Sequence, residues 1–169
     1  SFPTRRSSDL PGACSPNTAL ITLGTGLGFT HSIDGVVQKA DSGSPAKGIW
    51  NMPYEDGILE DAVSARGIRI AYARKTGDGS QSAYSIAQRA YSGDITAMEV
   101  YDNVGKILGD ALAPLQEELE FDTLLVGGQI AKSLSLMKKP LEAALPGMEI
   151  RQAPPKAVFR GLETLFENN

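Results

Sequence analysis

The sequence predicts an α/β fold with a mixed sheet, and two short apolar runs carry this prediction. Residues 19–23 and 123–126 each have the length and composition of a strand that is buried on both faces. Each run ends in glycines, and a long stretch of mainly helical pattern separates the two. Because ligands bind beyond the carboxyl ends of strands in an open α/β sheet, we expect both glycine turns to face one crevice.

The first glycine turn reads Gly24-Thr25-Gly26-Leu27-Gly28 and predicts contact with phosphate. Glycines let the backbone turn sharply and bring its N–H groups close to an anion. The spacing excludes the dinucleotide-binding fingerprint, whose third glycine would fall at Phe29, and no Gly-Lys-Ser/Thr follows to make a P-loop. A turn shaped for backbone geometry alone is the alternative interpretation.

The second glycine turn consists of Gly127, Gly128 and Gln129. Its two glycines present no side chains, so a flat heterocycle or a ribose can lie close to the main chain. Together, the two turns predict a nucleotide site.

The rest of the pattern predicts a hairpin and a series of helices. Asp34-Gly35 between two apolar runs is typical of a type I′ hairpin turn, so a β-hairpin should follow the phosphate turn. Asp94 is the expected N-cap of the longest helix, and Pro114 inside that helix predicts a kink or a break. Helices are expected at 58–63, 68–75, 82–91, 95–119, 135–145 and 157–166, and a short edge strand at 148–152.

Composition limits the function classes. The 169 residues carry a formal net charge of −4, which gives no electrostatic reason to expect nucleic acid or an anionic membrane as a partner. No apolar run approaches the roughly 20 residues of a membrane helix, so a cytoplasmic protein is the default. With one cysteine, Cys14, and one histidine, His31, the chain allows no intrachain disulfide and no zinc site built from Cys and His.

Three further predictions concern individual segments. Residues 1–16 show no helical or strand period and resemble, up to about residue 10, a translated sequencing adapter; we expect a disordered, extraneous segment before a domain at 17–169. His31 is expected to be structural rather than catalytic. Glu60 and Asp61 are adjacent on a predicted helix, where neighbours diverge by roughly 100°, so a solvated helix face is favoured over acid–base catalysis.

Several motifs resemble the ROK family (repressor, open reading frame, kinase), which belongs to the actin-like sugar kinases. Residues 21–28 resemble that family's second phosphate motif, and residues 125–131 its adenosine motif. Leu59-Glu60 with Ser64-x-Arg66-Gly67-Ile68 is similar to the segment that follows the family's zinc site, and Arg160-Gly161-Leu162 to its terminal helix. The resemblance implies the C-terminal, ATP-binding lobe of an actin-like ATPase (ribonuclease H-like) fold.

The resemblance also implies an activity, namely ATP-dependent phosphorylation of a sugar hydroxyl, with an aspartate as general base and Mg²⁺ on the phosphates. Gly24, Thr25, Gly26 and Gly28 would then lie at the ATP phosphates, and Gly127, Gly128 and Gln129 at the adenosine. The family's catalytic aspartate lies upstream of the first motif, so the resemblance implies a truncated lobe that binds nucleotide without its catalytic base. A homodimer is a further expectation.

Two departures from the family pattern affect the sugar and zinc sites. The family's Glu-x-Gly-His would fall near residues 47–51, where this sequence reads Lys-Gly-Ile-Trp-Asn, and the Cys-rich zinc motif is replaced by Pro-Tyr-Glu-Asp-Gly at 53–57. We therefore expect no zinc. Two alternatives to the kinase hypothesis remain: the sugar-sensing effector domain of a ROK-type transcriptional repressor, and a scaffold that keeps the fold without ligands.

Overall fold

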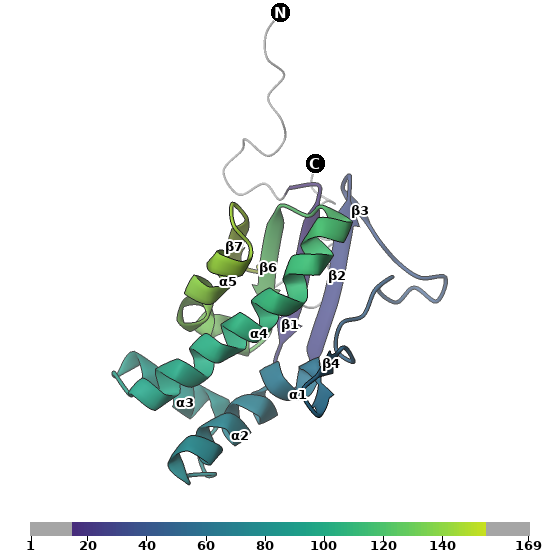
Figure 1. Cartoon of the computed structure of the whole chain (residues 1–169). Helices are drawn as coiled ribbons and strands as arrows, with labels where there is room; N and C mark the ends of the chain where they lie inside the picture. Colours follow the sequence, from purple (N-terminus) through teal and green to yellow (C-terminus); the bar gives the residue numbers. More distant parts are fainter. Residues whose placement is uncertain (1–14, 155–169) are drawn as a thin grey trace, which may run out of the picture.

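The computed structural model describes residues 15–154, and its centre is a five-stranded mixed sheet (Figure 1). The strand order is β3-β2-β1-β6-β7. β1 pairs with β2 and β2 with β3 in antiparallel fashion, whereas β1–β6 and β6–β7 are parallel. The strands span Thr18–Leu23 (β1), Leu27–Ile33 (β2), Val36–Val37 (β3), Thr123–Gly127 (β6) and Glu149–Gln152 (β7). The mixed sheet and the edge position of β7 confirm the sequence-based prediction.

The predicted hairpin forms between β2 and β3. Asp34 and Gly35 have φ angles of 50° and 79°, the positive values that a type I′ turn requires at both central positions. A second, very small hairpin joins β4 (Pro53–Tyr54) to β5 (Gly57–Ile58). Sequence patterning missed this hairpin because proline and glycine are depleted in strands.

Helices fill the chain between β5 and β6, as predicted. They are α1 (Leu59–Val63), α2 (Ala65–Thr76), α3 (Ala83–Tyr91) and α4 (Ile95–Leu119). The Asp94 carboxylate accepts a hydrogen bond from the Ala97 N–H, which confirms it as the N-cap of α4. Gly77 ends α2 in the left-handed conformation.

Two helix predictions need correction. The alternative of a break at Pro114 is wrong, because α4, 25 residues long, continues past Pro114 to Leu119. The single helix expected at 135–145 is instead a 3₁₀ helix, η2 (Ile130–Leu136), followed by α5 (Lys138–Ala144). Pro140 explains the division, since it lacks the N–H that a continuous α-helix would donate to Leu136. The helix predicted at 157–166 lies outside the described residues.

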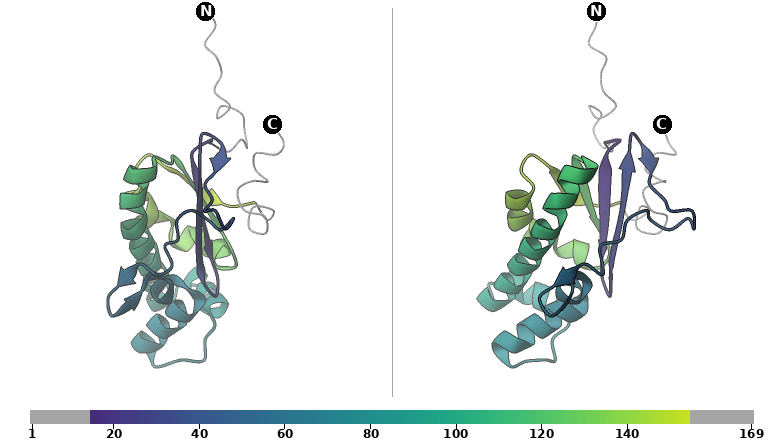
Figure 2. Two further views of the ribbon diagram at one scale, coloured as in Figure 1. Left: turned by 90° about the vertical axis from the view of Figure 1, so that its right-hand side faces the viewer. Right: turned by 45° about the vertical axis from the view of Figure 1, so that its right-hand side comes forward.

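The long helix α4 runs along one face of the sheet, and α2 and α3 gather beyond the sheet end at which β1 and β6 terminate (Figures 1 and 2). The core lies between α4 and the sheet. Gly105 and Gly109 of α4 allow α5 to approach: a Cβ on Gly105 would lie 2.5 Å from the Met137 carbonyl oxygen. The packed helices thus hold the strands of the sheet in place, and β1 and β6 in turn set the positions of the two glycine turns.

Candidate functional site

The two predicted glycine turns lie side by side. β1 and β6 are parallel neighbours, with Thr22 opposite Gly127, so both strands end at the same edge of the sheet (Figure 1). The contact is intimate, because a Cβ on Gly128 would collide with the Leu23 carbonyl oxygen. Gly128 also has a φ of +88°, a conformation that residues with side chains rarely adopt. The geometric part of the prediction, that the turns share one edge, is confirmed.

The first turn is the tip of the β1–β2 hairpin. Leu23 pairs with Leu27, so Gly24, Thr25 and Gly26 form the tip, and the Gly24 N–H donates to the Gly26 carbonyl oxygen over 3.1 Å. Within residues 15–154, the amides of Thr25 and Gly26 have no hydrogen-bond acceptor. Unpaired successive N–H groups are the feature by which backbone nests bind anions.

The space around this tip differs from one glycine to the next. A Cβ on Gly24 would meet no atom within 4 Å, and its φ is not positive, so nothing in the described chain demands glycine there. A Cβ on Gly28 would collide with the Thr22 Oγ1 across the β1–β2 pair. Gly24 therefore leaves room for a ligand, whereas Gly28 also serves the close approach of two strands.

The residues at the junction of α1 and α2 form hydrogen bonds with the tip of the β1–β2 hairpin. The Ala65 N–H, at the start of α2, donates to the Gly24 carbonyl oxygen over 2.8 Å. The Leu27 N–H donates to the Glu60 Oε2 over 2.9 Å. The Ser64 side chain caps α2 by accepting from the Gly67 N–H. These contacts fix the tip on both of its sides.

Sequence reasoning missed Glu60. The expectation of a solvated face is correct for Asp61, which is exposed and forms an ion pair with Arg66. It is wrong for Glu60, which is half-buried against the glycine turn. The two partners lie 33 residues apart in the chain, and no local pattern reports such a contact.

The adenosine-side residues follow β6 directly. Gly127 is the last, buried residue of β6, and Gln129 is exposed at the N-cap of η2 without a side-chain capping bond. Their assignment to adenosine stays a prediction, as does that of Gly24, Thr25, Gly26 and Gly28 to phosphates.

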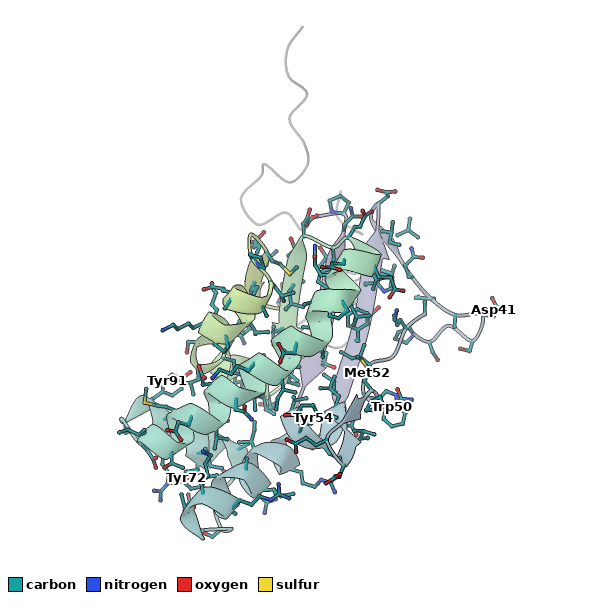
Figure 3. All side chains as sticks on the ribbon, viewed as in Figure 1. Asp41, Trp50, Met52, Tyr54, Tyr72 and Tyr91 are labelled. Carbon is teal, nitrogen blue, oxygen red and sulfur yellow. The ribbon has the colours of Figure 1, made fainter. Side chains whose placement is uncertain are left out.

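The segment expected to carry the family's Glu-x-Gly-His is a loop next to α1. Ile49 is buried, whereas Trp50 is 49% exposed and points away from the ribbon beside β4 (Figure 3). The Trp50 carbonyl oxygen accepts from the Glu60 N–H over 3.0 Å, which ties this loop to the residue that contacts the glycine turn. Among residues 15–154, no three His, Cys, Asp or Glu side chains come together as a metal site. No described helix is long and apolar enough to cross a bilayer.

Comparison with known proteins identifies the family. The sequence model of the ROK family matches residues 14–160. The chain belongs to the ROK family. The family membership that the sequence motifs predicted is thereby confirmed.

A curated relative supports the same assignment. The chain is 26% identical to a glucokinase of Halalkalibacterium halodurans, over 88% of this chain and 52% of the relative. The chain thus spans about half the length of that glucokinase.

Solved structures share the fold. A glucokinase from Parabacteroides distasonis superposes with a TM-score of 0.65 at 27% identity, covering 76% of this chain and 39% of the other. A ROK glucokinase from Streptomyces griseus, in complex with glucose and AMPPNP, gives 0.71 at 19% identity, covering 92% and 60%. A ROK transcriptional regulator, a homologue of the E. coli MLC protein, gives 0.77 at 20% identity, covering 90% and 46%. The fold is therefore the actin-like ATPase fold of the ROK sugar kinases.

Proposed function

We propose that this chain is the nucleotide-binding lobe of an ATP-dependent sugar kinase. The observation that carries the proposal is the pair of adjacent glycine turns at the carboxyl ends of β1 and β6. The free amides of Thr25 and Gly26 bind the phosphates, and the open side of Gly24 admits them. Gly127, Gly128 and Gln129 flank the adenosine, and Gly28, in β2 directly after the tip, completes the phosphate turn.

The related glucokinases support this proposal. One of them was solved with glucose and AMPPNP, an ATP analogue, on the same fold. Transfer of a phosphoryl group relies on positioning and charge stabilisation, which a rigid backbone cradle supplies. Mg²⁺, bound to the ATP phosphates, would partly neutralise their charge. The catalytic base is assigned to the family's upstream aspartate and to no described residue. The sugar, a homodimer, the absence of zinc and a cytoplasmic location stay predictions.

Thermal denaturation tests the nucleotide proposal. A ligand that binds only the folded state stabilises it by mass action, so ATP·Mg²⁺ at ten times its Kd adds about 1.4 kcal/mol and raises the Tm by roughly 3–6 °C. Trp50 is the sole tryptophan, and it is linked to Glu60 through its carbonyl, so its fluorescence gives a second readout of binding. Unchanged Tm and fluorescence at millimolar ATP·Mg²⁺ would contradict the proposal.

Gly24→Ala locates the site. A methyl group at Gly24 fits the unliganded chain but occupies the space assigned to phosphate, so the Tm without ATP should stay within about 2 °C while the ATP response falls. Gly79→Ala is the matched control, because Gly79 has an ordinary φ and, among the described residues, its Cβ would meet only Ala73, at 4.0 Å. An ATP response of Gly24→Ala equal to that of the control would remove this turn from the site.

A ROK transcriptional regulator shares this fold with a TM-score of 0.77, so the effector domain of a ROK-type repressor is a second candidate. At 20% identity this likeness shows the fold alone. The two candidates differ in what the complete gene encodes upstream: a DNA-binding helix-turn-helix supports the repressor, and the family's catalytic aspartate supports the kinase. The coding sequence upstream of this segment distinguishes them.

A further inference from the structure

The carboxylate of Glu60 lies against the proposed phosphate turn, although nothing in the nucleotide proposal uses it. Its Oε2 accepts from the Leu27 N–H over 2.9 Å, and a Cβ on Gly26 would lie 2.9 Å from the same oxygen. The absence of a side chain at Gly26 thus leaves room for the carboxylate. A hydrogen bond from a backbone N–H to an ionised carboxylate is about twice as strong as one between neutral groups.

The backbone of Glu60 is itself held in place, which limits where its side chain can reach. The Glu60 N–H donates to the Trp50 carbonyl oxygen, and the Glu60 carbonyl oxygen accepts from the Ser64 N–H, each over 3.0 Å. Ser64 caps α2, whose first N–H, that of Ala65, holds the Gly24 carbonyl. One short corner of the chain therefore reaches both sides of the glycine turn, through Glu60 at one side and Ala65 at the other.

We propose that Glu60 is a positioning residue of the nucleotide site: its carboxylate fixes the Leu27 end of the glycine turn and directs the phosphates to the Gly24 side. This inference rests on the proposed function. The carboxylate lies against the Cα of Gly26, where its negative charge repels phosphate, so the phosphates reach the free amides of Thr25 and Gly26 from the open Gly24 side. The same charge makes binding depend on a divalent cation, because Mg²⁺ reduces the charge that the ATP phosphates bring close to Glu60.

Two variants of nearly equal side-chain length separate the hydrogen bond from the charge. Glu60→Gln keeps an oxygen that accepts from the Leu27 N–H but carries no charge, whereas Glu60→Met carries neither. We expect Glu60→Met to lose at least about tenfold in affinity for ATP·Mg²⁺, as loss of a charge-assisted hydrogen bond implies. Glu60→Gln should retain that affinity and bind magnesium-free ATP more tightly than the wild type does. Asp61→Asn is the control, since Asp61 is exposed and should change neither value.

Amide hydrogen exchange in the absence of nucleotide tests the positioning separately. The Leu27 amide should exchange about tenfold or more faster in Glu60→Met than in the wild type. Its rate in Glu60→Gln should lie between the two, because the neutral amide oxygen accepts a weaker hydrogen bond. If Glu60→Met does not fold, Glu60→Ala replaces it in both measurements.

Each failure has a distinct meaning. Unchanged Leu27 exchange in Glu60→Met overturns the positioning role. If Glu60→Met exchanges faster but binds ATP·Mg²⁺ as tightly as the wild type, the fixed turn is not needed for binding. If Glu60→Gln binds magnesium-free ATP no more tightly than the wild type, the charge of Glu60 does not act on the phosphates. If the wild type shows no ATP response at all, the proposed function is wrong, and so is the inference that Glu60 directs the phosphates. The exchange data still decide whether Glu60 fixes the turn.

Discussion

At Gly128 the Leu23 carbonyl oxygen occupies the place of a side chain, whereas at Gly24, in the neighbouring turn, a Cβ would meet no atom of residues 15–154 within 4 Å. The two glycines also differ in backbone conformation, because Gly128 has a φ of +88° and Gly24 is not in the left-handed region. Gly128 thus serves contact within the chain. Gly24 is free of that constraint, so the ligand-binding interpretation has its firmest geometric support in the first turn.

The two glycine turns also differ in the contacts that hold them in place. The second turn packs its backbone directly against the end of β1. The first turn is held by hydrogen bonds from outside the sheet, to Glu60 and from Ala65, and two of its amides remain unpaired within the described part of the chain. If this turn binds phosphate as proposed, its fixed ends reduce the entropy cost of binding, and the free donors at its tip contact the anion.

The largest effect should come from Gly128→Ala. The substitution combines a positive φ with a collision against backbone, which together cost about 2–5 kcal/mol of the free energy of unfolding. Urea denaturation of the wild type and the variant measures the difference. A loss below about 1 kcal/mol would show that the turn relaxes easily, and the contrast with Gly24 would disappear.

A smaller effect is expected from Gly28→Ala. The added methyl group would collide with the Thr22 Oγ1, and overpacking of this kind costs about 1–3 kcal/mol. The double variant Thr22→Ala/Gly28→Ala removes the hydroxyl and leaves the new Cβ an ordinary contact with the Thr22 Cβ, at 3.6 Å. We therefore expect the double variant to regain most of the stability lost in Gly28→Ala, as measured in a double-mutant cycle. Absence of this rescue would mean that Gly28 serves something other than strand approach.

The sequence predicted the elements whose signals are local. The Asp34-Gly35 turn, the Asp94 cap and the bounds of α4 all depend on residues a few positions apart, and the structure has them as predicted. The pairing of two glycine turns across the sheet also followed from the sequence, because parallel strands end at a common edge.

Other features depend on contacts that no local pattern encodes. The role of Glu60 depends on a partner 33 residues away. The division between η2 and α5, by contrast, has a local signal in Pro140, which the helix prediction at 135–145 did not take into account. The glycines of the two turns look alike in sequence, yet their different constraints became visible only once the surroundings of each Cβ position were known. Tertiary neighbours therefore decide which of two similar motifs is structural.

The smallest expected effect comes from His31, on β2. Its substitution should change the stability of the sheet but leave the glycine turn unaffected. His31 is buried, and its Nδ1 has no hydrogen-bond partner in residues 15–154. Burial, and secondarily the positive charge of Lys47, lowers the pKa of His31, while the charge of Glu118 opposes this shift. In the unfolded chain the imidazole titrates near its ordinary pKa of 6.5. His31 therefore binds a proton more readily in the unfolded state than in the folded state.

Stability should consequently fall as the pH drops through 6.5, level off below the lowered pKa of the folded state, and show no contribution from His31 at pH 8. Because His31 is the sole histidine, His31→Gln should flatten the dependence of the free energy of unfolding between pH 5 and 8. An equal pH dependence in both proteins would contradict the burial of a neutral imidazole. The Tm increase caused by ATP·Mg²⁺ at pH 8 should be the same in the wild type and in His31→Gln, because His31 pairs with Ala19, far along the hairpin from the Leu23–Leu27 tip. Gly24→Ala, in contrast, should lower that increase.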